Sequence, residues 1–166
     1  SLMIGAAKFG MDFRIVAPTA FFIRKEDDET AIEIEEKTKG RIFFTEATIE
    51  GSKDADVIYT DVWVSMGETK EVWKERIERL SYYQVNSELV KHAKSDYIFM
   101  HCLPAFHDLN TKVAKEIEKE YGIKEMEVTD EIFRSENSVV FDEAENRMHT
   151  IKAVMVATLG DREYPL

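Results

Sequence analysis

Short apolar segments alternate with helical segments along this chain, and that alternation limits the possible folds more than any other feature. Apolar runs short enough for buried strands lie at residues 13–17, 42–44, 57–60 and 97–101, and shorter extended segments are expected at 126–128 and 138–140. Helical segments lie between these runs, and strands that alternate with helices in this way form a parallel sheet. We therefore predict an α/β fold in one domain, a doubly wound and mostly parallel sheet with helices on both faces.

The helical segments are recognised by apolar residues at three- and four-residue spacing and by capping residues. Gly10, Gly40 and Gly122 are placed to end helices, and Asn86 is placed to begin one. The last helix carries an apolar stripe that predicts a buried face. The expected helices cover residues 2–10, 28–39, 47–55, 70–81, 86–93, 111–121, 130–134 and 142–159, and the stripe is formed by Ala144, Met148, Ile151, Met155 and Leu159.

Composition excludes several classes of function. The net charge of −11 argues against surfaces for nucleic acid or anionic membranes, which need basic patches. No apolar stretch approaches the roughly 20 residues of a membrane span. A single cysteine excludes an internal disulfide and predicts a reducing, cytoplasmic location. No group of Cys and His residues has the spacing of a zinc site, so we expect no metal and no cofactor.

The segment MHCLPA at residues 100–105 follows an apolar run and is closed by Pro104, which cannot continue a strand ladder. Cys102 therefore lies where a parallel strand ends, and open α/β sheets bind ligands at such ends. A small buried thiol is the plainer alternative. His101 should point to the opposite face from Cys102, and His107 is an unsupported candidate for a base.

A second candidate loop follows the strand at residues 57–60. Asp61 there could bind an ammonium group, and Ser65 could add a hydrogen bond, although both residue types are common in ordinary turns. Arg147 lies one position from the apolar stripe of the last helix and should sit at the border of its buried face. Its guanidinium could bind an anion or a carbonyl, or could simply pair with Glu143 one turn earlier. The chain contains no nucleophile elbow and no glycine-rich nucleotide loop.

Five segments together resemble ornithine carbamoyltransferase. They are DVWVSMG at residues 61–67, YQVN at 83–86, HCLPA at 101–105, VTDE at 128–131 and DEAENRMH at 142–149. The similarity extends from Leu2 to about Gly160 and implies the C-terminal, L-ornithine-binding domain of that family, with a Rossmann-like fold.

The resemblance also implies roles for individual residues. Asp61 should bind the ammonium and amine end of L-ornithine, while Ser65 and Met66 lie on a loop that closes over it. The thiolate of Cys102 should lie near the δ-amine, and the carbonyl of Leu103 should face the carbamoyl amide.

Arg147 should donate hydrogen bonds to the carbamoyl oxygen. The implied reaction transfers the carbamoyl group of carbamoyl phosphate to the neutral δ-amine of L-ornithine, giving L-citrulline and phosphate. It uses no metal.

The chain also departs from the family pattern. It lacks the Ser-Thr-Arg-Thr-Arg and His-Pro-x-Gln segments that bind carbamoyl phosphate, and the strand expected before Ser1. In a sheet ordered 3-2-1-4-5 that strand is central. We therefore expect residues 1–166 to be a single ornithine-binding domain truncated at its N-terminus and inactive alone. Unpaired strand edges and exposed apolar faces, to which the last helix adds, should favour self-association. The family resemblance suggests a trimer-based homo-oligomer.

Two other functions stay open from the sequence. The chain could belong to a carbamoyltransferase for a related amine, such as putrescine or an acylated ornithine. Alternatively, it could be a non-catalytic relic that binds amino acids. The Asp61 loop favours ornithine over the related amines, and the intact Asp61, Cys102 and Arg147 favour a piece of an active enzyme over a relic.

Overall fold

Four short strands form two parallel pairs in the computed structural model, which describes residues 1–22, 33–34, 36–65 and 67–160. Strand β1 (Asp12–Val16) pairs with β2 (Arg41–Thr45), and β3 (Val57–Thr60) pairs with β4 (Ile98–His101). In the described part of the chain, each pair is a separate two-stranded sheet. The parallel pairing agrees with the predicted α/β fold, although the expected single sheet is divided into two pairs.

Two of the expected extended segments are not strands. Residues 126–128 and 138–140 each contribute only an isolated parallel bridge, Val85 with Val128 and Phe99 with Ser138. Val140 already belongs to the last helix, which therefore begins two residues earlier than the sequence predicts. Both segments are fixed by single bridges beside β4 and α5, too few to form a ladder.

The helices agree well with the expected positions. Asn86 Oδ1 accepts the Leu89 N–H at 3.0 Å, and Gly122 ends a helix at φ 72°. Much of the helix expected at residues 28–39 lies outside the described residues. The helices are α1 (Leu2–Lys8), α3 (Thr48–Ser52), α4 (Lys70–Leu80), α5 (Ser87–Val90), α6 (Lys112–Tyr121), α7 (Asp130–Phe133) and α8 (Val140–Leu159), with 3-10 turns η1 (Thr19–Phe21) and η2 (Ser81–Tyr83).

Two hydrophobic clusters hold the larger part of the chain together. The first packs Phe99 of β4 against α7 and the start of α8, and includes the side chains Ile58, Val85, Tyr97, Phe99, Val128, Ile132, Phe133 and Val140. The second packs α4 against α6, and includes Trp63, Val64, Ile77, Phe106, Ala114, Ile117 and Met126. Trp63 and Val64 of the loop after β3 and Phe106 of the loop after β4 belong to the second cluster, so both loops are anchored in packed core.

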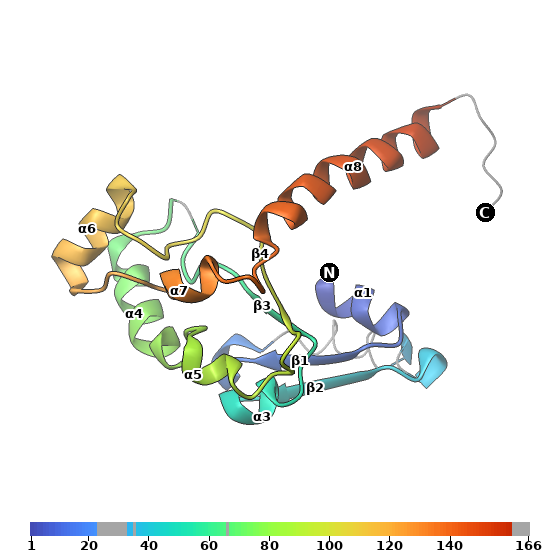
Figure 1. Cartoon of the computed structure of the whole chain (residues 1–166), viewed down its shortest axis with the longest axis horizontal. Helices are drawn as coiled ribbons and strands as arrows, with labels where there is room; N and C mark the ends of the chain where they lie inside the picture. The colour runs from blue at the N-terminus through green and yellow to red at the C-terminus, as the bar shows by residue number, and fades with distance from the viewer. Residues whose placement is uncertain (23–32, 35, 66, 161–166) are drawn as a thin grey trace.

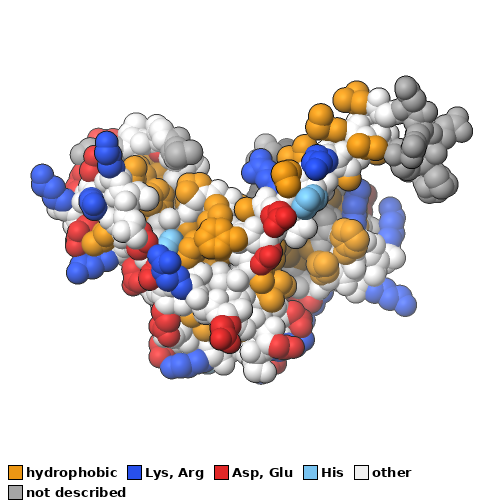
Figure 2. Space-filling model, turned by 45° about the horizontal axis from the view of Figure 1, so that its top comes forward, with side chains coloured by type: hydrophobic (Ala, Val, Ile, Leu, Met, Phe, Trp, Pro, Cys, Tyr) orange, Lys and Arg blue, Asp and Glu red, His pale blue; other side chains and the backbone are white. Residues whose placement is uncertain are grey.

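Helix α8 extends away from the rest of the molecule (Figure 1). Its apolar stripe is exposed, with Ile151 49% and Met155 53% accessible, and Figure 2 shows hydrophobic side chains along it. The buried face predicted from helical spacing is therefore not formed among the described residues, whereas the exposure of this helix that the resemblance implied is confirmed. None of the helices in the described part of the chain is long and apolar enough to cross a membrane.

Candidate functional site

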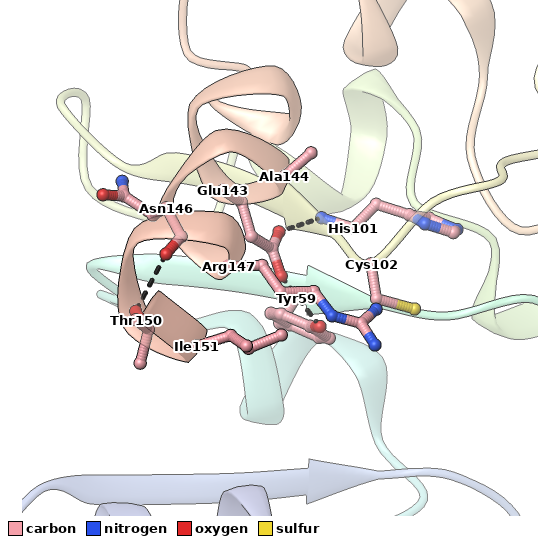
Figure 3. A pocket seen from close by; sticks show the side chains of 9 residues that line it. All are labelled: Tyr59, His101, Cys102, Glu143, Ala144, Asn146, Arg147, Thr150 and Ile151. Carbon is pink, nitrogen blue, oxygen red and sulfur yellow. Dashed lines mark hydrogen bonds between the residues drawn. The ribbon is translucent and has the colours of Figure 1, made fainter. Parts of the chain in front are cut away.

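A pocket of about 460 Å³ lies where β3 and β4 end and α8 begins (Figure 3). Its position agrees with the general rule that parallel sheets bind ligands beyond the carboxyl ends of their strands. Two of the residues predicted for the site, Cys102 and Arg147, line it. The full lining is Tyr59, His101, Cys102, Glu143, Ala144, Asn146, Arg147, Thr150 and Ile151.

The predicted residues Asp61 and Cys102 are brought into direct contact. They follow neighbouring parallel strands, and the thiol of Cys102 donates a hydrogen bond to Asp61 Oδ1 at 3.0 Å. The same oxygen accepts the Val62 N–H at 2.7 Å, which fixes the carboxylate at the end of β3. Asp61 therefore has the local turn contact expected of an ordinary capping residue, and in addition faces the cysteine.

Cys102 is a protonated thiol at neutral pH in this arrangement. Burial, the hydrogen bond to Asp61 and the negative charges of Asp61 and Glu143 raise the pKa of the thiol to about 11. The resemblance had implied a thiolate here, next to the δ-amine of bound ornithine. The difference arises because both neighbouring carboxylates disfavour a second negative charge.

Glu143 joins three elements at the base of the pocket. One carboxylate oxygen accepts the hydroxyl of Tyr59 at 3.0 Å, and the other accepts the backbone N–H of His101 at 3.0 Å (Figure 3). The side chain thus ties the first turn of α8 to the ends of β3 and β4. Burial and the hydrogen bond to Glu143 raise the pKa of Tyr59, so its hydroxyl stays protonated.

Arg147 lies one helical turn after Glu143, on the exposed part of α8. Figure 3 shows its guanidinium extended toward Cys102 and Tyr59. Glu143 directs both of its oxygens elsewhere, and Arg147 forms no ion pair with the described residues. The prediction that Arg147 lies at the border of a buried face is therefore wrong. Its guanidinium nevertheless faces the pocket with its donors available.

Leu103 adopts an unusual backbone conformation next to Cys102. Its φ is 44°, and its N–H donates to the Nδ1 of His101 at 3.0 Å. His101 is fully buried, as expected for a side chain on the opposite face from Cys102, and its other ring nitrogen lies 3.2 Å from Glu127 Oε1. A left-handed leucine is energetically unfavourable, so its surroundings must hold it there.

The loop after β3 is only partly brought to the site. Ser65 is exposed and does not line the pocket, although its carbonyl accepts the Glu68 N–H at 3.3 Å. Met66 lies outside the described residues. The predicted roles of Ser65 and Met66 therefore stay predictions.

Three residues of this site were not found from the sequence: Tyr59, Glu143 as a bridging group, and Glu127. A signal existed for two of them. Tyr59 lies two residues before Asp61 in the same strand segment, and Glu143 lies one turn before Arg147. Glu127 had no such signal, because it is 26 residues from His101 and belongs to no periodic segment.

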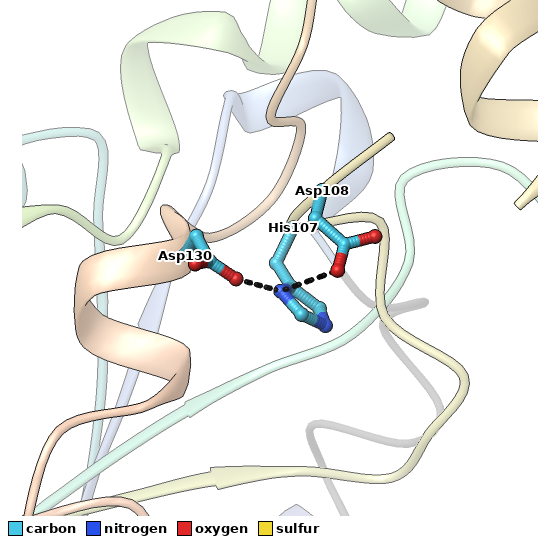
Figure 4. A group of neighbouring side chains, drawn as sticks. All are labelled: His107, Asp108 and Asp130. Carbon is cyan, nitrogen blue, oxygen red and sulfur yellow. Dashed lines mark hydrogen bonds and ion pairs between the residues drawn. The ribbon is translucent and has the colours of Figure 1, made fainter. Parts of the chain in front are cut away.

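A second polar cluster contains the one group among the described residues that could hold a metal ion, formed by His107, Asp108 and Asp130 (Figure 4). His107 Nδ1 lies 2.6 Å from Asp130 Oδ1. Arg134 already binds this group, with its Nε 2.8 Å from Asp130 and its Nη2 3.3 Å from Asp108. Burial raises the pKa of Asp130, but hydrogen bonds from His107 and Arg134 outweigh this effect and hold the pKa below its usual value. The cluster is therefore a network that joins α7 to the loop between β4 and α6. No contact with Cys102 supports His107 as a base.

Comparison with known proteins agrees with this geometry. The sequence profile described as "Aspartate/ornithine carbamoyltransferase, Asp/Orn binding domain" matches residues 1–158. An ornithine carbamoyltransferase of Limosilactobacillus reuteri is 56% identical over 163 residues, which are 98% of this chain and 49% of that protein.

Solved structures show the same relationship. Ornithine carbamoyltransferase from Pyrococcus furiosus has a TM-score of 0.82 at 39% identity, over 98% of this chain and 46% of that one. The anabolic enzyme from Campylobacter jejuni has a TM-score of 0.80 at 30% identity, over 98% and 48%. The chain thus spans about half the length of the relatives it matches. It belongs to the aspartate/ornithine-binding domain family of the carbamoyltransferases.

Proposed function

We propose that this chain is the L-ornithine-binding half of an ornithine carbamoyltransferase. The observation that carries the proposal is the contact of Asp61 with Cys102, beside a pocket into which Arg147 extends. Asp61 and Glu143 supply two negative charges, and Arg147 supplies one positive charge. The two carboxylates complement the ammonium group of an amino-acid ligand, and Arg147 is left to donate to the carbamoyl oxygen.

The proposed reaction forms a bond between the δ-nitrogen of ornithine and the carbonyl carbon of carbamoyl phosphate. The δ-nitrogen attacks as the neutral amine, the bond from that carbon to the bridging phosphate oxygen breaks, and the proton lost by the δ-nitrogen leaves with the phosphate, so citrulline and hydrogen phosphate are released. Asp61 holds the amino acid near Cys102, and Arg147 donates to the carbamoyl oxygen as negative charge develops on it. The carbonyl of Leu103 faces the carbamoyl amide.

Carbamoyl phosphate requires groups that this chain does not supply. The sequence lacks the basic and polar segments expected to bind the phosphate, so we infer that the second substrate binds mainly to another half of the enzyme. The chain alone should be inactive. We also propose that residues 1–166 act as one domain, that a homo-oligomer forms through exposed apolar surface such as the stripe of α8, and that the enzyme is cytoplasmic.

Two alternative functions are less well supported. A carbamoyltransferase for putrescine or an acylated ornithine is not favoured, because the relatives that are 30–56% identical are named ornithine carbamoyltransferases. A non-catalytic relic is not favoured either, because Asp61, Cys102 and Arg147 are all retained near one pocket.

The test is isothermal titration of the chain with L-ornithine, L-norvaline and putrescine. Norvaline lacks the δ-amine and putrescine lacks the α-carboxylate, so selective binding of ornithine requires recognition of both ends. We expect millimolar affinity for ornithine, at least tenfold loss in Asp61→Asn, and no change in Glu68→Gln, which removes the same charge from the same loop.

Activity is tested by joining the chain to the first half of the Limosilactobacillus reuteri relative. The joined protein should form citrulline from carbamoyl phosphate and ornithine, and the chain alone should not. Equal binding of all three ligands, together with no citrulline from the joined protein, would contradict the proposal.

A further inference from the structure

A buried carboxylate lies beneath the turn that carries Cys102 and Leu103. Glu127 has no exposed surface, and neither has His101. Glu127 Oε1 lies 3.2 Å from His101 Nε2 and accepts the Phe106 N–H at 2.7 Å. One oxygen atom therefore contacts both ends of the segment between residues 101 and 106.

The hydrogen bonds of His101 fix its tautomer. Nδ1 accepts the N–H of Leu103 at 3.0 Å, so it carries no proton. Nε2 must then hold the ring proton and donate it to Glu127. The chain of contacts runs from Glu127 through the imidazole to the N–H of Leu103, which is the residue with the left-handed backbone.

Glu127 is itself held firmly in place. Its backbone carbonyl accepts the Val85 N–H at 2.9 Å, and the Met126 N–H donates to Phe106 at 2.8 Å. Its second carboxylate oxygen, Oε2, has no partner among the described residues. Burying a carboxylate with one unpartnered oxygen lowers stability, and a hydrophobic residue of similar size is often tolerated at such a position. Stability alone therefore does not account for an acidic residue here.

We propose that Glu127 is a positioning residue, which holds the 101–106 turn through His101 and Phe106 so that Cys102 and the Leu103 carbonyl face the ornithine site. This assignment rests on the proposed function for its ligand, but the placement of the turn can be tested without any ligand. Glu127 does not touch the pocket, and acts only through the residues that it holds.

The single cysteine gives a direct measure of the turn. Cys102 is the only thiol in the chain, so the rate of alkylation by iodoacetamide as a function of pH reports this residue alone. Asp61 and Glu143 face the thiol with negative charge, and Tyr59 and Arg147 also line its pocket. Together with burial, the two carboxylates hold the pKa of Cys102 at about 11, against an ordinary value near 9.

The informative variant is Glu127→Met, which removes both acceptor contacts and fills a similar volume. If the turn loosens, Cys102 moves away from Asp61 and its pKa falls toward the ordinary value. Thiolate at pH 8 then rises by at least tenfold and at most roughly 100-fold, with a matching rise in alkylation rate. Glu127→Gln keeps one acceptor oxygen, which can make both contacts, and should leave the alkylation rate close to that of the unmodified chain.

Val128→Ala is the matched control. Val128 is fully buried on the same segment and its side chain offers no hydrogen-bond acceptor to the turn, so its truncation should lower stability and leave the pH profile of alkylation unchanged. An unchanged profile in Glu127→Met, or the same shift in Val128→Ala, would overturn the proposal.

Nitrogen-15 NMR of the imidazoles in the unmodified chain provides a second test, which does not depend on how the variants fold. The ring proton of His101 should be on Nε2. A proton on Nδ1 would overturn the proposal, because Leu103 could not then donate to that atom. In the joined enzyme, Glu127→Met should weaken ornithine binding at least tenfold. If the unmodified protein binds no ornithine, the proposed function fails, whereas the alkylation and NMR results still decide the role of Glu127.

Discussion

Replacement of Glu143 by alanine should separate α8 from the strands and destabilise the chain. The carboxylate accepts two hydrogen bonds, each of 3.0 Å, from Tyr59 on β3 and from the His101 N–H at the end of β4. A hydrogen bond to a charged group contributes roughly 1.5–3 kcal/mol. Glu143 is half-buried, so water replaces part of what is lost. We therefore expect Glu143→Ala to lower the free energy of unfolding by about 2–4 kcal/mol.

Milder variants divide this effect between its two contacts. Glu143→Gln keeps one acceptor oxygen and should lower the free energy of unfolding by about 1–2 kcal/mol. Tyr59→Phe removes one hydroxyl and should lower it by about 1 kcal/mol. Because Tyr59 and Glu143 share a hydrogen bond, the double variant Tyr59→Phe/Glu143→Ala should be less destabilised than the sum of the single variants, by about 1 kcal/mol.

Urea unfolding followed by far-ultraviolet circular dichroism at pH 7 measures these differences. Asp142→Ala is the control, because it also removes an acidic residue from the first turn of α8 but has an exposed side chain. Asp142→Ala loses a favourable interaction with the helix dipole, which should lower the free energy of unfolding by about 0.5 kcal/mol. The reasoning fails if Glu143→Ala is no more destabilising than Asp142→Ala, or if the effects of Tyr59→Phe and Glu143→Ala simply add.

Three further predictions concern pH, the core and α8. Folding raises the pKa of Cys102 from near 9 to about 11, so the contribution of this thiol to stability is complete below pH 9 and is lost as the pH rises to 11. The midpoint of urea unfolding should therefore fall less between pH 9 and 11 in Cys102→Ser than in the unmodified chain. An equal dependence of the midpoint on pH in both proteins would contradict the pKa shift. Phe99→Ala removes a fully buried ring and should cost about 3–5 kcal/mol in urea unfolding, and a loss below about 1 kcal/mol would show that Phe99 is not central to the core. Sedimentation should show concentration-dependent association that Ile151→Glu/Met155→Glu reduces, and a monomer at high concentration in the unmodified chain would refute it.

The contact of Asp61 with Cys102 could be anticipated from the sequence, although the two residues are 41 positions apart. Each follows a short apolar strand, and neighbouring parallel strands end at the same edge of a sheet. Their positions at the ends of two neighbouring parallel strands are therefore enough to predict that these residues lie close together. The alternation of side chains along a strand placed His101 on the face opposite to Cys102, and the structure shows that this side chain is buried.

Other features depend on partners that no local pattern reveals. Glu127 lies in a segment with a single bridge, and its role arises only when Val85 and Phe106 are brought beside it. The conformation of Leu103 follows from a bond to a ring two residues earlier, not from the intrinsic preference of leucine. The stripe of α8 was recognised correctly as apolar, but burial depends on a covering surface and not on helical spacing.

The two halves of the candidate site are therefore held in different ways. Asp61 and Cys102 end strands that are packed into a core and supported from below by Glu127, so their relative position is determined within the described chain. Arg147 instead lies on an exposed helix, one turn beyond its connection to the strands through Glu143. Any surface that covers the apolar stripe of α8 must also influence the direction of the helix, and hence the distance between Arg147 and Cys102. In the proposed enzyme, the ornithine end of the site can thus form in this chain alone, whereas correct placement of the carbamoyl-binding arginine depends on what packs against α8.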